Sequence, residues 1–233
     1  MHPIERLRAL SRAGWAPPDV LAVEAAWALA DLADSEPQAM LPACRRLLQR
    51  HVDQGPLWWV CAHLLCSGDP VGEAARCTEL LESDPSAQHL LDELGDRRVV
   101  RRGGVGEVAS ADVVAVPVLA LGPGGMVVDP GVASLLEAAR ALEVPIWVDA
   151  GAGRLLPDRL WEALRRRLER PTSDRPEVTV LRSSWFDDGP PGGVGVVEPL
   201  VGVDRVAVPV GCLPLGRLAG AVDCPEPAGL VRW

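Results

Sequence analysis

The sequence predicts an α/β protein in which a helical N-terminal domain precedes a Rossmann-like, mostly parallel sheet flanked by helices. From Pro3 to about Leu94 the apolar residues recur at helical spacing. Near Gly95 the pattern changes to short, almost continuous apolar runs, which are typical of strands buried on both faces of a parallel sheet. Two such runs, at 111–119 and 144–148, are joined by a helical stretch, as in a βαβ unit. The expected domains are residues 1–94 and 95–233.

Prolines and glycines divide the N-terminal part into helices. Proline suits the first turn of a helix, because its φ angle is already helical and its missing N–H is not needed there. Pro17-Pro18, Pro37 and Pro56 therefore mark helix starts, and the turn Ser67-Gly68-Asp69-Pro70 marks an end. The Trp58-Trp59 pair is expected to pack in the core, with one ring facing the C-terminal part. Two shorter helices are expected at 72–82 and 86–94.

The C-terminal part alternates between short strands and helices. The turn Gly103-Gly104-Val105-Gly106 leads into a short helical stretch. A later helix is amphipathic, with Leu160, Trp161 and Leu164 on one stripe. The tail that begins at Pro214 is expected to be exposed, which is compatible with an interface. The expected strands lie at 97–100, 111–119, 144–148, 177–181, 194–198 and 203–208, and the expected helices at 132–142 and 157–169.

Composition and charge exclude several classes of function. The net charge of −9 and the pI of about 5.0 argue against a general nucleic-acid binder. No apolar run approaches the roughly 20 residues of a membrane span, and charges interrupt the first apolar positions, as they do not in a signal peptide. A cytoplasmic protein is therefore expected. Lys, Asn and Tyr do not occur, so a Schiff-base lysine, a P-loop lysine and a tyrosine acid are all excluded.

The six cysteines are expected to be reduced thiols. Cys61, His63, Cys66 and Cys77 suggest a zinc site, but their spacing does not favour one. Cys61 and His63 lie two positions apart on an expected helix, roughly 200° around its axis, and so point away from each other. Thiols packed in the core are the preferred interpretation, and no metal or other cofactor is expected. A small metal-binding module over residues 61–77 is the weaker alternative.

Candidate ligand-binding residues cluster around the βαβ unit. Gly104-x-Gly106-x-x-Ala109 matches the dinucleotide fingerprint formally, but the next strand follows too closely for the long helix that holds a pyrophosphate. The glycine turn before the crossover helix could present free N–H groups to a phosphate, which Asp129 would repel unless it caps the helix, the preferred interpretation. Asp149 follows a strand at the sheet edge where such folds bind ligands. The candidate residues are Arg102, Gly124, Gly125, Asp129, Gly131 and Asp149.

A catalytic residue cannot be assigned among them. Spacing gives Asp149 neither a second carboxylate nor a nucleophile as a partner. The pair Ser183-Ser184 has no fixed histidine or aspartate context, and the chain holds only four histidines from which to build a triad. The remaining arginine clusters fit a solvated helix face better than an anion site.

The stretch from Ala111 to Gly151 resembles the alpha, beta and delta subunits of translation initiation factor 2B. It is similar also to their enzyme relatives, methylthioribose-1-phosphate isomerase and ribose-1,5-bisphosphate isomerase. The residues that match the family pattern are the strand Asp112-Val113-Val114-Ala115-Val116, the turn Pro123-Gly124-Gly125, Gly131, the helical SLLEAARAL and Val144-Pro145-Ile146-Trp147-Val148. The resemblance implies a helical domain followed by a Rossmann-like domain, and a homodimer or an oligomer of related subunits.

This chain differs from the family pattern at residues that carry the chemistry of the isomerases. Where the family has G-A-D, this chain has Pro117-Val118-Leu119, so leucine replaces the catalytic aspartate of the isomerases. Where the family has N-K, this chain has Val128-Asp129, and the negative charge of Asp129 would repel a sugar phosphate. The expectation is a non-catalytic relative with a regulatory, scaffolding or ligand-sensing role. The alternative is a divergent isomerase-like enzyme that acts on a sugar phosphate or nucleotide through Asp149 and an arginine clamp.

Overall fold

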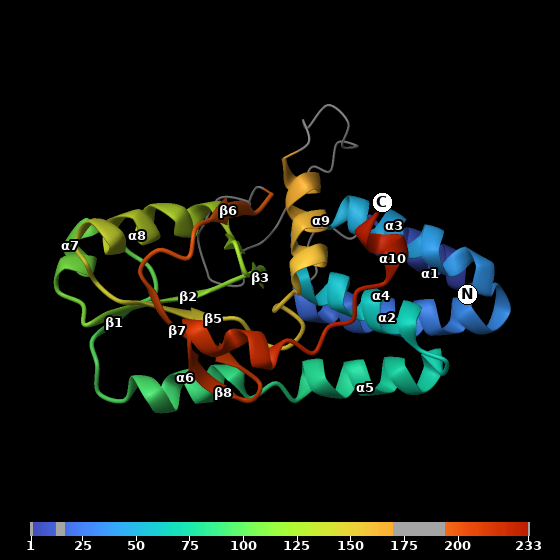
Figure 1. The fold of residues 1–233 in the computed structure, drawn as a ribbon, viewed down its shortest axis with the longest axis horizontal. Helices are drawn as coiled ribbons and strands as arrows, with labels where there is room; N and C mark the ends of the chain where they lie inside the picture. The colour runs from blue at the N-terminus through green and yellow to red at the C-terminus, as the bar shows by residue number, and fades with distance from the viewer. Residues whose placement is uncertain (1, 13–16, 170–193, 233) are drawn as a thin grey trace.

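The computed structural model describes residues 2–12, 17–169 and 194–232. A bundle of helices lies at one end of the molecule, and a sheet between helical layers lies at the other (Figure 1). Both chain termini lie at the helical end. None of the helices in the described ranges is long and apolar enough to cross a membrane.

The helical end is built around α2, whose buried face is rich in alanine and leucine. Small side chains let its neighbours α1, α4 and α5 pack closely against it. Prolines open several of these helices, as predicted; α5 begins two residues earlier than expected, because Asp69 caps it by accepting a hydrogen bond from the Gly72 N–H. The elements are α1 (Pro3–Leu10), α2 (Pro18–Ser35), η1 (Pro37–Ala39), α3 (Met40–Arg50), α4 (Gly55–Cys66) and α5 (Pro70–Glu82). The next helix, α6 (Ser86–Leu94), packs against the sheet at the other end.

A five-stranded sheet with the order β1-β2-β5-β7-β8 forms the other end, and its first four strands are parallel. Its central strands β2 and β5 are buried on both faces. Val114 and Val116 of β2 pack in one apolar cluster with α8, whereas Val113 and Ala115 pack in another with α6. The α/β fold class is therefore confirmed. The elements are β1 (Val99–Val100), α7 (Val105–Ala109), β2 (Val113–Pro117), α8 (Pro130–Ala141), β5 (Ile146–Asp149), β7 (Val203–Val208) and β8 (Gly211–Pro214).

A second, three-stranded sheet was not expected from the sequence. The apolar run at 111–119 does not stay in one strand, because the chain leaves the main sheet after Pro117 and forms an antiparallel hairpin. The strand expected at 194–198 pairs with this hairpin and does not join the main sheet. The strand expected at 177–181 and the pair Ser183-Ser184 lie outside the described residues. The elements are β3 (Ala120–Gly122), β4 (Gly125–Val128) and β6 (Val196–Glu198).

The C-terminal tail is buried in part, which corrects the expectation that it is exposed. After η3 (Leu215–Ala221) the chain returns to the helical end, where α10 (Ala228–Val231) lies beside α9 (Asp158–Leu168) and α3. Cys224 and Leu230 are buried there, in the same apolar cluster as Trp58 and Trp161. We call residues 222–232 the strap. The division into domains at residue 94 stays a prediction.

Candidate functional site

Asp149 is the last residue of β5. The main sheet lies beside the helical bundle (Figure 1). Burial raises the pKa of its carboxyl group, the positive charge of Arg154 partly offsets this shift, and the charge of Asp84 adds to it. The N–H of Gly151 also donates a hydrogen bond to Asp149. The structure thus places this carboxylate at the carboxyl end of β5, where the sequence predicted it, and its role in ligand binding stays a prediction.

The charged neighbours of Asp149 hold the helical bundle to the sheet. Arg154 donates two hydrogen bonds of 2.8 Å to the carboxylate of Asp19, at the start of α2. Asp84, between α5 and α6, accepts a hydrogen bond of 2.7 Å from the N–H of Ala152. We call Asp19, Asp84, Asp149 and Arg154 the Asp149 junction. Because Arg154 and Asp84 already make these bonds, the junction is assembled as a structural contact between the two ends of the molecule.

Other predicted ligand residues lie in different surroundings. Gly124 and Gly125 belong to the tip of the β3–β4 hairpin, which packs against Trp161 of α9. Asp129 caps α8 by accepting a hydrogen bond of 2.9 Å from the N–H of Gly131, which confirms the capping interpretation. The structure does not bring these four residues together with Asp149.

Arg102 is exposed in the turn after β1. Its neighbour Arg101 is the residue of that turn whose positive charge lowers the pKa of Asp149. A role of Arg102 in ligand binding stays a prediction.

The segment that follows β2 contacts the start of α4 at Leu119. The carbonyl oxygen of Leu119 accepts a hydrogen bond of 2.9 Å from the N–H of Gly55, at the start of α4. A Cβ atom on Gly55 would lie 2.7 Å from that oxygen and 3.1 Å from the Cα of Arg154. Helix α4 can approach this closely only because residue 55 has no side chain. The backbone around Leu119 is therefore in direct contact with the helical bundle.

The four main strands β1, β2, β5 and β7 follow one another in the sheet in the order of the sequence. Open α/β sheets bind ligands in the crevice that forms where the strand order reverses. Among the described parallel strands no such reversal occurs. The strand order thus gives Asp149 no crevice of this type.

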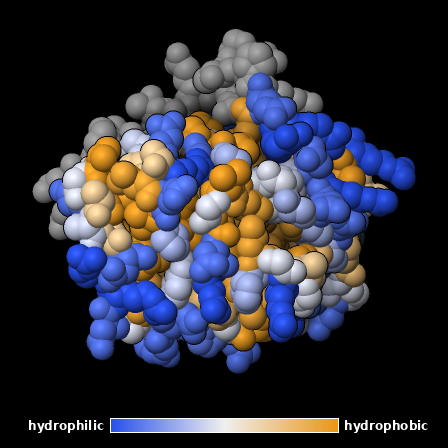
Figure 2. All heavy atoms as spheres, turned by 60° about the vertical axis from the view of Figure 1, so that its left-hand side comes forward, coloured by the Kyte–Doolittle hydropathy of each residue, from blue (hydrophilic) through white to orange (hydrophobic). Residues whose placement is uncertain are grey.

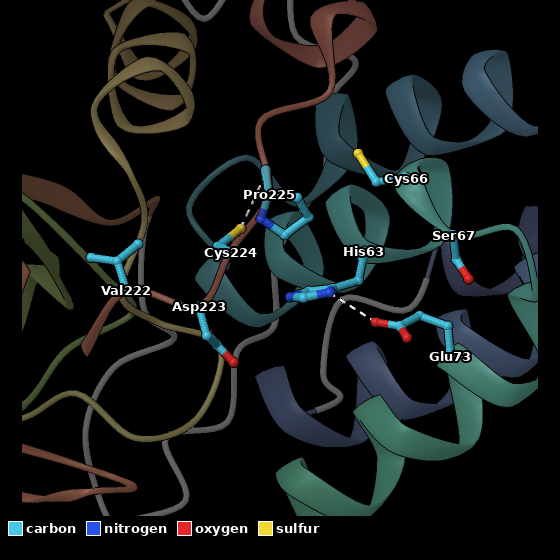
Figure 3. Close-up of a pocket in the computed structure, with 8 residues that line it drawn as sticks. All are labelled: His63, Cys66, Ser67, Glu73, Val222, Asp223, Cys224 and Pro225. Carbon is cyan, nitrogen blue, oxygen red and sulfur yellow. Dashed lines mark hydrogen bonds and ion pairs between the residues drawn. The ribbon is translucent and has the colours of Figure 1, made fainter. Parts of the chain in front are cut away.

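An open depression of about 510 Å³ lies at the helical end, between α4, α5 and the strap (Figure 3). Its walls come from segments far apart in the sequence. We call it the His63 depression, and its lining residues are His63, Cys66, Ser67, Glu73, Val222, Asp223, Cys224 and Pro225.

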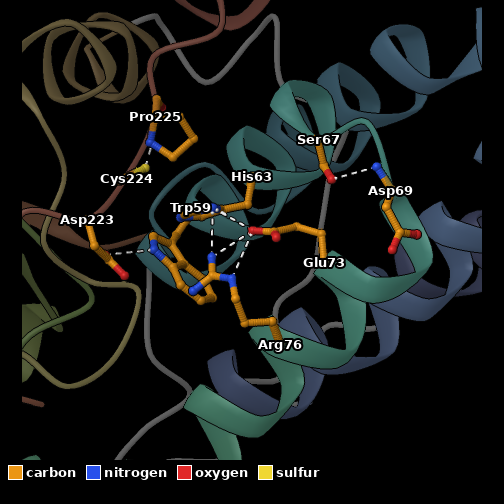
Figure 4. Close-up of polar contacts among 9 residues, drawn as sticks. All are labelled: Trp59, His63, Ser67, Asp69, Glu73, Arg76, Asp223, Cys224 and Pro225. Atoms are coloured by element: carbon orange, nitrogen blue, oxygen red, sulfur yellow. Dashed lines mark hydrogen bonds and ion pairs between the residues drawn. The ribbon is translucent and has the colours of Figure 1, made fainter.

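A chain of polar contacts runs through the wall of the His63 depression (Figure 4). His63 Nδ1 lies 2.8 Å from Glu73 Oε1 and 2.9 Å from Arg76 Nη2. Arg76 Nη2 also donates a hydrogen bond of 2.7 Å to Glu73. Trp59 Nε1 donates a hydrogen bond of 3.0 Å to Asp223, which confirms that one tryptophan of the pair contacts the C-terminal part.

Burial and the positive charge of Arg76 shift the pKa values of Glu73 and His63. Hydrogen bonds from Arg76 hold the pKa of Glu73 below its usual range. Burial lowers the pKa of His63, and the positive charge of Arg76 lowers it further, against the opposing charges of Asp223 and Glu73. The imidazole is therefore neutral at pH 7. Because a carboxylate only accepts, we assign the imidazole proton to Nδ1, facing Glu73. Arg76, which only donates, then lies beside Nδ1 without a hydrogen bond to it, and Nε2 is left as an acceptor.

The cysteines near the His63 depression are thiols. Burial raises the pKa of Cys66, Cys77 and Cys224. Cys61, one of the residues of the zinc interpretation, lies in the core, where it contacts Cys44. Within the described ranges, no three His, Cys, Asp or Glu side chains are arranged to hold a metal ion.

The His63 depression could not be found from the sequence. The spacing of Glu73 and Arg76 indicates an ion pair on one helix face, but nothing local connects them to Asp223. The bond between Trp59 and Asp223 spans 164 positions of the chain. Only the return of the strap to the helical end brings these residues together.

Comparisons with known proteins agree with this fold. No protein-family model matches the sequence, and no curated protein matches it. The structure is similar to translation initiation factor eIF-2B from Pyrococcus horikoshii OT3, with 14% identity, a TM-score of 0.62, and coverage of 92% of this chain and 98% of the other. It is similar also to eIF2B beta from Chaetomium thermophilum, with 12% identity, a TM-score of 0.64, and coverage of 98% and 91%.

A third similar structure is the tetrameric eIF2B-beta2-delta2 complex from C. thermophilum, with 12% identity, a TM-score of 0.61, and coverage of 94% of this chain and 92% of the other. The likeness extends over both ends of this molecule and over nearly the whole length of each relative. The resemblance first visible in residues 111–151 thus holds for the architecture of the entire chain, which has the fold of the translation initiation factor 2B subunits.

Proposed function

We propose that this chain is a non-catalytic subunit with the initiation factor 2B fold, which acts as a scaffolding or regulatory component of an oligomer. The observation that carries the proposal is the packing at Leu119. A leucine occupies the position of the aspartate on which the isomerases of this fold depend, and its backbone is sealed against α4 by the bond from Gly55. At the position of the family's lysine, Asp129 is engaged in capping α8.

Assembly is supported by apolar side chains on the face opposite the helical bundle. Hydrophobic side chains gather there in a band bordered by hydrophilic ones (Figure 2). The loop around Val201 is held against α8 by Arg140, which donates a hydrogen bond of 3.1 Å to the carbonyl of Val201. Leu142, just beyond the end of α8, is 41% exposed, and Val201 is 65% exposed. Apolar side chains in such positions are typical of subunit interfaces.

The test of assembly is the molar mass of the purified chain, measured by light scattering after size exclusion and by sedimentation velocity. We expect a dimer or larger species that the double variant Leu142→Glu, Val201→Glu converts to a monomer. A matched control is Val71→Glu, which places the same charge at a 53% exposed valine of α5, at the helical end. A monomeric wild-type chain would contradict self-assembly and leave only assembly with a different subunit, to be tested by co-purification.

A divergent enzyme acting on a sugar phosphate or nucleotide is the second candidate. The observation that favours it is the raised pKa of Asp149 at the carboxyl end of β5, close to the arginines of the β1 turn. Thermal-shift measurements with ribose 5-phosphate and with AMP distinguish the two candidates, because a ligand that binds the native state raises its melting temperature. We expect no shift. A shift that Arg102→Ala abolishes would favour the enzyme.

A further inference from the structure

Helix α10, in the last part of the strap, is held by two arginines that come from different helices. Arg45 of α3 donates hydrogen bonds of 3.2 and 2.8 Å, from Nε and Nη2, to the carbonyl oxygen of Gly229. Arg166 of α9 donates one of 3.0 Å, from Nη2, to the carbonyl oxygen of Val231. The two carbonyl groups lie two positions apart in the chain, so both guanidinium groups lie against the same short helix.

Arg166 keeps its positive charge in this position, because its hydrogen bonds go to neutral carbonyl groups. Its Nε donates a second hydrogen bond, of 3.2 Å, to the carbonyl of Glu162 in the same helix. The two bonds fix the plane of the guanidinium group and use only two of the five N–H groups of an arginine. The sequence favours a solvated arginine here, whereas the structure shows one that is both exposed and held in place.

Two further arginines lie next to these residues in the chain. Arg46 follows Arg45 on α3, and Arg232 follows the last residue of α10. Both side chains are exposed, and neither makes an ion pair within the part of the chain that the structure describes. We call Arg45, Arg46, Arg166 and Arg232 the arginine face.

The carboxylates near the arginine face are engaged with other arginines. On α9, Glu162 accepts a hydrogen bond of 3.2 Å from Arg165, and Glu169 lies 3.8 Å from the same side chain. On the strap, Glu226 accepts a hydrogen bond of 3.0 Å from the backbone N–H of Arg159 and lies 3.9 Å from its Nε. Helix α3 contains no acidic residue. The arginine face is therefore positively charged, in a chain whose net charge is −9.

Partly buried apolar side chains accompany these arginines. Leu41, one turn before Arg45 on α3, packs so closely on α10 that a Cβ atom on Gly229 would lie 2.7 Å from it. Leu41 and Val231 both lie at the edge of the apolar core of the bundle, where they are only partly buried. The surface thus combines guanidinium groups with apolar contacts, which suits a protein segment better than a small free anion.

We propose that the arginine face binds an acidic segment of a partner protein, one that carries both carboxylates and apolar side chains. An arginine can pair with a carboxylate through two parallel N–H···O bonds. Guanidinium groups that are already held in place lose little conformational entropy on binding. A nucleic acid fits less well, because its phosphates would continue past the face onto a surface whose net charge is negative.

The arginine face is separate from the surface proposed for assembly. It lies at the helical end, whereas Leu142 and Val201 lie beside α8 at the other end of the molecule (Figure 1). Binding of an acidic segment therefore does not rest on self-assembly, and a monomeric chain should bind the segment as well as a dimer does.

Fluorescence anisotropy on the full chain tests the proposal, with a labelled peptide of glutamate, leucine and alanine as the probe. One control peptide has glutamine in place of glutamate, and a single-stranded RNA of similar length is a second control. We expect the glutamate peptide to bind saturably, with a Kd below about 1 mM that rises with salt because solvent ions screen exposed charges. Equal affinity for the glutamine peptide, tighter binding of the RNA, or no saturation would each overturn the proposal.

Removal of single charges locates the site. Arg166→Gln should raise the Kd of the glutamate peptide by about tenfold, because it removes a charged donor that is already fixed. Arg46→Gln and Arg232→Gln should each raise it by about threefold, as expected for exposed ion pairs. Arg217→Gln is the matched control, since Arg217 is an exposed arginine of η3 that makes no ion pair with the described residues. An equal rise in Arg217→Gln and Arg166→Gln would show a general effect of net charge and refute the site.

Arg166→Gln also removes a bond to α10, so its melting temperature is measured in parallel. If that variant is destabilised, the double variant Arg46→Gln, Arg232→Gln decides, because both side chains are exposed. An unchanged Kd in the double variant would then refute the proposal.

The assembly variant Leu142→Glu, Val201→Glu separates this proposal from self-assembly. It should bind the glutamate peptide within about twofold of the wild type, whatever its oligomeric state. Loss of binding in this variant would place the site at the other end of the molecule and contradict the proposal.

Discussion

Asp149 and His63 are both titratable side chains that burial pushes toward the neutral form, and both lie beside an arginine. The arginine has opposite effects at the two positions. At the Asp149 junction, Arg154 opposes burial because it attracts the carboxylate. At the His63 depression, Arg76 acts with burial because it repels the imidazolium. Lowering the pH should therefore relieve the cost of the buried Asp149 carboxylate, whereas it should introduce the cost of a buried charge at His63.

The two regions differ also in how tightly they are packed. Next to the Asp149 junction, Gly55 lies so close to the backbone of Leu119 and Arg154 that there is no space for a side chain. The His63 depression is open to solvent and borders an exposed cysteine and a serine. Substitutions should consequently be costly at the first region and mild at the second, and the following predictions test that contrast.

The largest effect is expected for Gly55→Ala. Alanine normally favours a helix over glycine by roughly 1 kcal/mol. Here its Cβ would lie 2.7 Å from the carbonyl oxygen of Leu119, which is backbone and cannot rotate away. We expect the free energy of unfolding in urea to fall by about 1–3 kcal/mol, the usual cost of overpacking.

The matched control for that substitution is Gly68→Ala. A Cβ atom at Gly68 meets nothing within 4 Å. Equal urea midpoints for the two variants would show that α4 does not press on Leu119.

Arg154→Gln should have the next largest effect. It removes two hydrogen bonds to Asp19 and the only arginine that sits within the junction beside Asp149. Because the Arg154 side chain is 15% exposed and Asp19 is 41% exposed, solvent screens part of the attraction. We expect a loss of about 1–2 kcal/mol in the free energy of unfolding. A double-mutant cycle with Asp19→Asn isolates the pair, and a coupling energy of zero would contradict its structural role.

Asp149→Asn should have a smaller effect that depends on pH. The folded state raises the pKa of Asp149, so the ionised carboxylate costs stability at pH values above that raised pKa. We expect the variant to be more stable than the wild type at pH 7, by up to about 1 kcal/mol. The difference should shrink as the pH falls toward 4, because the wild-type carboxyl then becomes neutral as well. A difference in unfolding free energy that stays constant between pH 7 and pH 4 would disprove the shift.

The smallest effect is expected for Cys66→Ser at the His63 depression. Cys66 is exposed at the end of α4, so a hydroxyl there replaces a solvent-facing thiol. The free energy of unfolding should change by less than about 0.5 kcal/mol. A loss as large as that of Gly55→Ala would mean that the depression is as tightly packed as the junction.

Much of the fold could be predicted because its signals are local. The apolar run at Val113 and its neighbours, the helix after Asp129 and the strand around Trp147 are each encoded within about ten residues, the length over which hydrophobic periodicity acts. The cap of α8 by Asp129 is likewise a contact between residues two positions apart. The resemblance to the initiation factor 2B subunits rests on this same continuous stretch.

The second sheet, the contact between Gly55 and Leu119 and the His63 depression could not be predicted, because their partners are remote in the chain. Val127 pairs with Val197, Gly55 bonds to Leu119, and Trp59 bonds to Asp223. Hydrophobic periodicity acts over short stretches of the chain and does not connect residues that are so far apart.

The sequence by itself therefore determined most of the helices and the βαβ unit. Tertiary structure alone decided that the space beside Leu119 is closed by α4, and that Asp149 is held among Asp84 and Arg154 with a raised pKa. It also decided that a histidine of α4 meets the strap. The physical reason is that propensity and hydrophobic pattern act along the chain, whereas burial and charge act through space between segments that only folding brings together.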